Sequence, residues 1–144
     1  MAHTYALNLL HIVFSTKNRL PMIHDLDALA KNLRGIARNK KMDLMAVGGT
    51  ANHVHLLLRM PPVRPLSEAV RDLKANSSRF IRETGRNFAW QDGYAAISVS
   101  PSQVPIVRKY IETQERHHAK RTFEQDLVAL LDKSGVQYER EYVF

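Results

Sequence analysis

The chain has no cysteine in its 144 residues. This absence excludes a disulfide scaffold, a cysteine nucleophile and a thiolate zinc site, and it fits a reducing compartment. Any metal ion must therefore be held by histidine, carboxylate or amide side chains. The N-terminus also lacks the basic start and apolar run of a signal peptide, and no stretch approaches the ~18 apolar residues of a membrane span, so we expect a cytoplasmic protein.

Acidic residues are scarce relative to basic ones. Lys and Arg number 21 against 14 for Asp and Glu, which gives a net charge of +7 and a pI near 9.9. Such a balance favours a polyanionic partner, and nucleic acid is the first candidate. The hydrophobic content of 44% suffices for one sizeable core but not for two, so residues 1–144 are expected to form a single domain.

Hydrophobic periodicity predicts strands and helices in a mixed order. Residues 5–15 are dense in β-formers and indicate a buried strand, while 42–49 and 52–60 indicate two strands that meet around Gly48 and Gly49. Asp92 and Gly93 favour a tight hairpin within residues 88–99. Helical spacing marks 25–40, 66–84, 102–118 and 122–134. This order predicts an α+β fold, a mainly antiparallel sheet of the ferredoxin or RRM type covered by helices.

Helix-end signals support these boundaries. Asp25 is a plausible N-cap for the first helix, and Gly135 is expected to end the last. Pro105 is tolerable in the third helix because it lies in the first turn, where its missing N–H has no helical partner.

The strongest local signal is the pair His53 and His55 in the run Asn52-His53-Val54-His55-Leu56-Leu57-Leu58. Side chains alternate along a strand, so both imidazoles project from one face, about 6.6 Å apart at the backbone, and can grip one ion. The competing interpretation is a chance pair on a half-exposed strand. The apolar surroundings weaken it, because buried imidazoles need partners.

Two other kinds of His-x-His site fit less well. Histidine-triad nucleotide hydrolases need a third histidine at the next alternate position, where this chain has Leu57. A cupin-type metal site needs more strands and further His or carboxylate ligands, and the many predicted helices argue against it.

A second signal is Tyr110 with Gln114 in the run VRKYIETQERHH. Residues four apart lie one above the other on a helix, so the phenol and the amide can face the same point. Alone, such a pair is typical of a helix surface.

Together these motifs resemble the single-tyrosine HUH transposases of bacterial insertion sequences and the related REP-associated tyrosine transposases. The resemblance runs nearly end to end, through HIVFSTKNR, NHVHLLL as the His-hydrophobic-His motif, WQDGYAAISVS, and YIETQ as the tyrosine helix. It implies that His53 and His55 bind a divalent metal, that Gln114 is a third ligand through its side-chain oxygen, and that Tyr110 is the nucleophile. It also implies a homodimer and a single-stranded DNA substrate with hairpin ends.

The chemistry agrees with what the resemblance implies. Two imidazoles and an amide are neutral ligands, so the charge of a bound ion can stabilise a phosphodiester under attack, and Mg²⁺ or Mn²⁺ suits that task. Attack by the phenol would form a 5′-phosphotyrosine and free a 3′-hydroxyl. The covalent link stores the bond energy, which fits the absence of a glycine-rich phosphate loop for ATP. A phenol of reference pKa ~10 needs a proton acceptor, a role that the sequence does not assign.

Basic residues near the motifs are candidates for contacts with DNA phosphates, which anchor the strand without reading its sequence. These are Lys17, Arg19, Arg71, Lys74, Arg82, Arg116, Lys120 and Arg121. The competing interpretation for each is a solvated basic face.

The remaining aromatic residues are assigned structural roles. Tyr5 is expected in the core, and Trp90 is expected there rather than stacked on a base. Tyr138 and Tyr142 are read as packing or surface residues, and Tyr94 as structural.

Three functions remain open at this stage. The first is a mobile-element transposase, favoured by Gln114, which the REP-associated group often lacks. The second is a domesticated relative that acts on palindromic repeats, and the third is a non-catalytic nucleic-acid-binding module with structural histidines. The histidines and Tyr110 lie far apart in the chain, so the sequence also leaves open whether one subunit or two build each site.

Overall fold

The computed structural model describes residues 3–118 and 121–139. Its centre is an antiparallel four-stranded sheet with the order β2-β3-β1-β4. The strands are β1 (Asn8–Ser15), β2 (Asp43–Gly49), β3 (His53–Met60) and β4 (Ala95–Ser98). The expected α+β fold with an antiparallel sheet is therefore confirmed.

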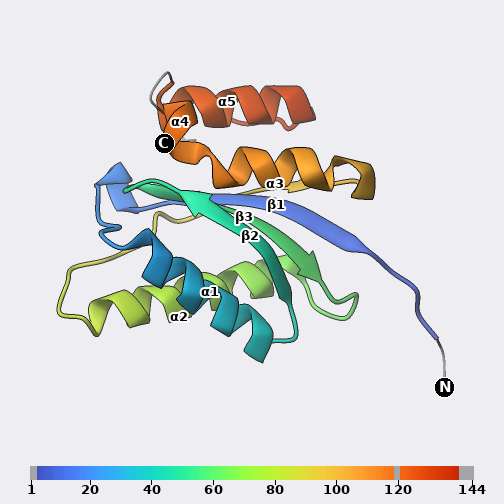
Figure 1. Cartoon of the computed structure of the whole chain (residues 1–144), viewed down its shortest axis with the longest axis horizontal. Coiled ribbons are helices and arrows are strands. Elements are labelled where there is room, and N and C mark those ends of the chain that lie inside the picture. Colours follow the sequence, from blue (N-terminus) through green and yellow to red (C-terminus); the bar gives the residue numbers. More distant parts are fainter. Residues whose placement is uncertain (1–2, 119–120, 140–144) are drawn as a thin grey trace.

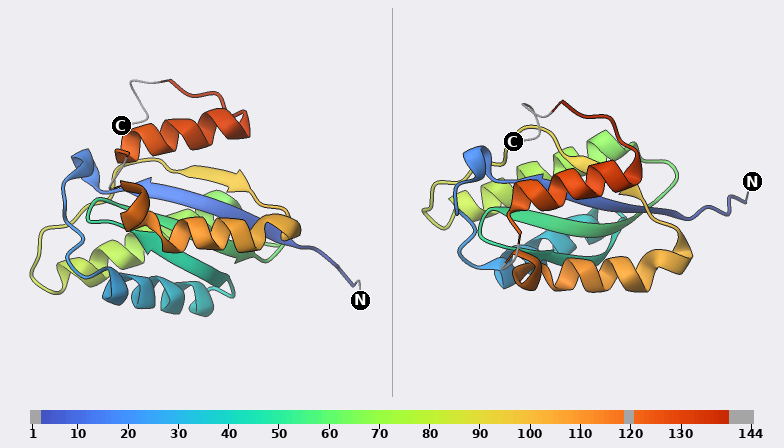
Figure 2. Two further views of the ribbon diagram at one scale, coloured as in Figure 1. Left: turned by 45° about the horizontal axis from the view of Figure 1, so that its top comes forward. Right: turned by 90° about the horizontal axis from the view of Figure 1, so that it is seen from above.

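Helices cover both faces of this sheet (Figure 1). On one face lie α1 (Leu26–Asn39) and α2 (Leu66–Arg82), and on the other lie α3 (Val104–Glu112), α4 (Gln114–His118) and α5 (Phe123–Ser134). The two views of Figure 2 show α3 and α5 side by side on that second face. None of the helices in the described ranges combines the length and apolar character that crossing a membrane requires.

Strand alternation divides the sheet into two differently used faces. The face toward α1 and α2 carries the main core, whose buried side chains include Ile12, Leu56 and Leu73. The opposite face carries smaller clusters in which Val13 packs against α5 and Leu57 packs against α3. Burial of the main core is the chief source of stability, and it leaves the second face available for chemistry.

The predicted helix ends are confirmed at both the first and the last helix. Asp25 caps α1 by accepting a hydrogen bond from Ala28 N at 3.0 Å. Thr122 and Gln125 form a capping box at α5, and Gly135 ends that helix in the left-handed conformation with φ of 72°.

Three expectations need correction. Tyr5 precedes β1 and is 93% exposed, so it is no core residue. The hairpin around Asp92 and Gly93 does not form, because the segments on both sides pair with the same neighbour: Trp90 bridges to Thr16, and β4 pairs with β1. The helix expected over 102–118 is divided into the short 3-10 helix η2 (Pro101–Gln103), α3 and α4, with a break at Thr113.

Trp90 lies in the core as expected, at 8% exposed. Its ring meets Phe14 and Phe88 edge-on, and its indole N–H donates to Ser77 Oγ at 3.0 Å. Among the tyrosines, Tyr94 is exposed and Tyr138 packs beside α5, where its hydroxyl donates to Asp132 Oδ1 at 2.9 Å. Tyr142 lies outside the described residues.

Candidate active site

The histidine pair lies on the face of the sheet that α3 and α5 cover. His53 and His55 are 0% and 1% exposed, and their ring centroids are 5.1 Å apart. The intervening Val54 points into the main core on the other face. The strand alternation read from the sequence therefore brings the two imidazoles together.

The loop before β3 fixes the orientation of the His53 ring. Its Nδ1 lies 2.8 Å from Asn52 Oδ1 and 3.0 Å from the Thr50 hydroxyl. Because the amide oxygen can only accept, Nδ1 carries the proton and donates to it. The lone pair then belongs to Nε2, which lies 3.4 Å from Gln114 Oε1.

A third histidine, which the sequence reading did not single out, supports His55. His11 of β1 is buried, and its Nε2 shares a hydrogen bond of 2.9 Å with His55 Nδ1. In the β1–β3 register Val13 is opposite His55 and His11 is opposite Leu57, so the two histidines meet diagonally across the strands. Burial lowers the pKa of His11 to about 4, while the charge of Asp126 acts to raise it, so the ring is neutral at pH 7.

Helix α3 brings Tyr110 beside the histidines of its own chain. The Tyr110 ring meets those of His55 and His11 edge-on, with centroids 5.6 Å and 5.9 Å away. Gln114 also reaches this face, and its amide nitrogen donates to Tyr110 O at 3.0 Å. All four residues named from the sequence therefore lie together within one chain.

Helix α3 can approach this closely because β2 has a glycine at the contact. A Cβ added to Gly48 would lie 1.7 Å from the carbonyl oxygen of Ile111, the residue after Tyr110. Ile111 is 0% exposed and packs on Leu57 and Ala46. Direct contact between the helix backbone and the strand thus sets the position of Tyr110.

Helix α5 covers part of the site through two of its side chains. Phe123 stacks on His53, with centroids 4.2 Å apart and ring planes 24° from parallel. Asp126 is 5% exposed and accepts a hydrogen bond from the Tyr110 hydroxyl. Burial, and after it this hydrogen bond and the charge of Asp126, raise the pKa of Tyr110 above its usual value, so the phenol is protonated at pH 7.

The spacing of two of the candidate donors is compatible with a shared divalent ion. Ligands about 2.1 Å from an ion and roughly 90° to 110° apart are about 3.0 to 3.4 Å from each other. The separation of 3.4 Å between His53 Nε2 and Gln114 Oε1 lies at the upper end of that range. In the described part of the chain no three His, Cys, Asp or Glu side chains form a metal cluster, so an ion here would depend on the Gln114 amide as a third protein ligand.

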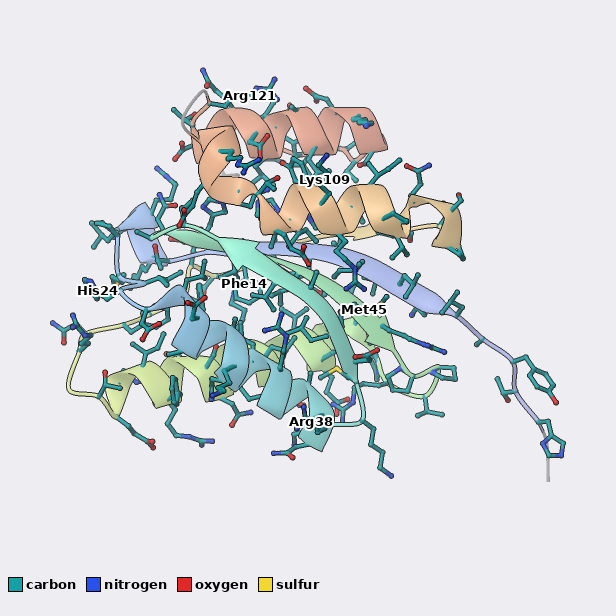
Figure 3. All side chains as sticks on the ribbon, viewed as in Figure 1. Phe14, His24, Arg38, Met45, Lys109 and Arg121 are labelled. Carbon is teal, nitrogen blue, oxygen red and sulfur yellow. The ribbon has the colours of Figure 1, made fainter. Side chains whose placement is uncertain are left out.

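The candidate DNA-contact residues divide between the two faces. Lys17 and Arg19 follow β1, and Arg19 forms an ion pair with Glu124 of α5. Arg121 lies 3.7 Å from Asp126 Oδ1, and Arg116 is exposed on α4. Figure 3 shows the labelled Lys109 and Arg121 on this side of the sheet and Arg38 on the opposite side.

The basic stripe on α2 lies on the far face and has local partners. Lys74 donates to Gln91 O at 2.6 Å and Gly93 O at 2.9 Å, and burial lowers its pKa. Arg71 lies near Glu68 and Asp72, while Arg82 is exposed at the end of the helix. Lys120 lies outside the described residues.

Asp126, His11 and Phe123 were not among the site residues predicted from the sequence. Asp126 and His11 could have been found, because each is a polar residue within an apolar pattern. Asp126 interrupts the apolar stripe of α5, and His11 interrupts an apolar strand. A polar residue at a core-facing position requires a partner, and in each case the partner is at the site.

Comparison with known proteins adds independent information. Residues 4–114 match the family model described as "Transposase IS200 like". The ISDra2 transposase TnpA of Deinococcus radiodurans is 29% identical over 115 residues, which cover 72% of this chain and 81% of that protein.

Two solved structures are similar. One, assigned as a transposase from Deinococcus radiodurans, is 26% identical with a TM-score of 0.62 and covers 79% of this chain and 96% of its own. The other is a REP-associated tyrosine transposase bound to a REP hairpin, 15% identical with a TM-score of 0.63, which covers 99% of this chain and 89% of its own. At that identity the second likeness is one of fold. The family match ends at Gln114, so α5 lies outside it.

Proposed function

This chain belongs to the IS200-like transposase family, and from that membership we propose that it cleaves and rejoins single-stranded DNA through a covalent bond to Tyr110. The observation that carries the proposal is the meeting of four residues in one chain. Tyr110 and Gln114 from α3 and α4 lie against His53 and His55 from β3, and the Tyr110 and His55 rings are 5.6 Å apart.

The proposed reaction is a transesterification at phosphorus. Tyr110 Oη attacks the scissile phosphodiester, the bond from phosphorus to the 3′ oxygen breaks, and a 5′-phosphotyrosine and a free 3′-hydroxyl result. Attack by a 3′-hydroxyl on the phosphotyrosine reverses the step and rejoins DNA. The number of ester bonds is unchanged throughout, so the strand transfer needs no ATP.

We propose that His53, His55 and Gln114 hold one Mg²⁺ or Mn²⁺ ion. With three neutral ligands the bound ion keeps its charge available to stabilise the phosphate oxygens during attack. The support is the 3.4 Å donor separation and the bonds that hold His53 and His55 by their Nδ1 atoms, because these bonds orient the rings.

The substrate and assembly are proposed from likeness to relatives. The REP-associated tyrosine transposase of similar fold is bound to a hairpin, and we propose that this chain acts at hairpin ends of a mobile element as a homodimer. The presence of Gln114 favours a mobile element over a domesticated relative that acts on palindromic repeats.

The decisive experiment compares Tyr110→Phe with Tyr94→Phe. The first removes the nucleophilic oxygen, whereas the second alters a tyrosine whose side chain is exposed. With labelled single strands from the element's own ends, the native chain and Tyr94→Phe should give a protein-DNA adduct that survives denaturant, and Tyr110→Phe should give none. An adduct in Tyr110→Phe would move the nucleophile elsewhere, and no adduct in the native chain would favour a non-catalytic binding module.

The metal proposal has its own test. Replacing both His53 and His55 with Ala should lower cleavage by roughly 10²- to 10³-fold, as expected for loss of an electrostatic contribution. Affinity for DNA should change far less, because basic residues dominate it. His24→Ala, at an exposed position, is the control. Equal loss of cleavage and binding would indicate a misfolded strand instead.

A further inference from the structure

The carboxylate of Asp126 contacts the oxygen that the proposed function makes the nucleophile. Asp126 lies on α5, between Phe123 and Leu127 on the buried face of that helix, and is itself 5% exposed. Its Oδ2 accepts the hydrogen bond of the Tyr110 hydroxyl, and its Oδ1 lies 3.7 Å from the Arg121 guanidinium. One carboxylate therefore joins α5 to the tyrosine helix.

Packing alone does not account for an acid at this position. Burying a carboxylate costs free energy unless it is hydrogen-bonded and paired, and an apolar residue would pack more favourably. Arg121 is 55% exposed, so screening by water weakens its compensation. The bond from Tyr110 is the contact that joins this buried carboxylate to the site.

We propose that Asp126 is the proton acceptor for Tyr110, an inference that rests on the proposed function. As the Tyr110 oxygen forms its bond to phosphorus, its O–H bond breaks and the proton passes to Asp126 Oδ2. The bond from phosphorus to the 3′ oxygen breaks, and that oxygen takes a proton from solvent. In the rejoining step the attacking 3′-hydroxyl releases its proton to solvent, and the protonated Asp126 returns its proton to the leaving Tyr110 oxygen, so one carboxyl group serves both directions.

Geometry favours Asp126 over His11 as the proton acceptor. A general base must be within hydrogen-bond reach of the proton it takes. His11 also faces Tyr110, but the ring centroids are 5.9 Å apart in an edge-on arrangement, and His11 Nε2 is engaged with His55 Nδ1. Asp126 is the group that already holds the phenolic proton.

The test measures adduct formation in a single turnover for Asp126→Asn and Asp126→Glu. Asparagine keeps the shape and can accept a hydrogen bond but cannot take the proton, so the rate should fall by roughly 10²- to 10⁴-fold. Glutamate should recover part of the rate. Asp132→Asn, which removes an exposed carboxylate further along α5, should react as the native chain. A native rate for Asp126→Asn would overturn the inference.

A second measurement separates proton transfer from a structural role. Placing a fluorinated tyrosine at position 110 lowers the pKa of the phenol and reduces the need for a base. It should restore a larger fraction of the rate in Asp126→Asn than it adds to the native chain. A deficit that is independent of the phenol pKa would overturn the inference and leave Asp126 as a packing residue.

A third measurement applies if Asp126→Asn proves unstable, because it uses chemical rescue of a different variant. In Asp126→Ala, sodium formate should raise the rate of adduct formation above that in equal sodium chloride, because a free carboxylate can occupy the emptied position. No difference between the salts would count against the proposal. Failure here is distinct from failure of the proposed function, since Tyr110→Phe tests the nucleophile in a chain that retains Asp126.

Discussion

Gly48 lies where the backbone of α3 rests on the sheet, next to the residues that define the site. An added Cβ would lie 1.7 Å from the carbonyl oxygen of Ile111 and 2.7 Å from its carbonyl carbon. Backbone atoms cannot move aside as a flexible side chain can, so any side chain here must push α3 outward.

We therefore predict that Gly48→Ala destabilises the fold by about 1 to 3 kcal/mol, as overpacking does, and abolishes most cleavage. Gly35→Ala is the matched control, because a Cβ at that position in α1 would meet no atom within 4 Å apart from the neighbouring backbone of its own helix. It should stabilise the chain by about 0.5 to 1 kcal/mol. Urea unfolding measures both changes, and a Gly48→Ala variant of native stability would mean that α3 is not held as described.

At the element scale, α1 and α5 can be compared because α1 lies on the core face of the sheet and α5 lies on the face that carries the site (Figure 1). Each begins with a side-chain cap: Asp25 accepts from Ala28 N at 3.0 Å, and Thr122 accepts from Gln125 N at 3.1 Å. Of these two helices, α5 is the one that contacts His53 and Tyr110, through Phe123 and Asp126.

Removing either cap should therefore cost similar stability but affect cleavage differently. Asp25→Ala and Thr122→Ala are each expected to lower the free energy of unfolding by about 1 kcal/mol. Thr122→Ala should also slow adduct formation, because the first turn of α5 carries the contacts with the site, whereas Asp25→Ala should leave the rate unchanged. Equal rates in the two variants would argue that α5 is only a structural cover.

Local patterns predicted the elements well where their cause was local. Alternation along β3 brings His53 and His55 to one face, and the helix ends at Asp25 and Gly135 follow from neighbouring residues. The hairpin failed because Asp92 and Gly93 have turn chemistry, but β1 offers one continuous edge to both flanking segments. Tertiary pairing decided that region.

Contacts between residues far apart in the chain could not be predicted from local sequence patterns. His11 and His55 are 44 positions apart, and their bond depends on strand register that no local pattern encodes. Asp126 and Tyr110 are 16 apart and lie on different helices, α5 and α3, so no helical spacing predicts their contact. The family resemblance gave the ligand and nucleophile assignments, which stay predictions, and α5 lies beyond the matched residues.

At the scale of the whole molecule, the main core and the candidate site lie on opposite faces of the sheet. The core against α1 and α2 is built from apolar side chains, so its stability does not depend on an ion. Three neutral ligands also bind an ion weakly, because no protein carboxylate offsets its charge.

We accordingly predict that a chelator leaves the melting temperature of the DNA-free protein unchanged while it stops cleavage. Circular dichroism during heating, with and without the chelator, measures the first effect, and the adduct assay measures the second. A large fall in melting temperature would instead indicate a structural metal site.

Assembly is a further property of the whole molecule. Tyr110 lies beside the histidines of its own chain, so each subunit of a dimer should contain a complete site. A mixture of His53→Ala, His55→Ala subunits with Tyr110→Phe subunits should then stay inactive, because every site carries a defect. Mass spectrometry should verify that subunits exchange. Cleavage regained in an exchanging mixture would show that helix and strand come from different subunits.

The ion pairs over the site affect how salt acts on DNA binding. Arg19 holds Glu124, and Arg121 lies near Asp126. When a DNA phosphate binds either arginine, it replaces the carboxylate that was paired with that arginine. The phosphate releases its own counterion, and the displaced carboxylate takes up a cation from solution. This exchange releases few ions in total, whereas binding to a solvated lysine releases about one per phosphate. The number of phosphate contacts inferred from the salt dependence of DNA affinity should therefore be lower than the number of arginines and lysines that contact DNA. The arginine contacts should persist at salt concentrations that disrupt the lysine contacts.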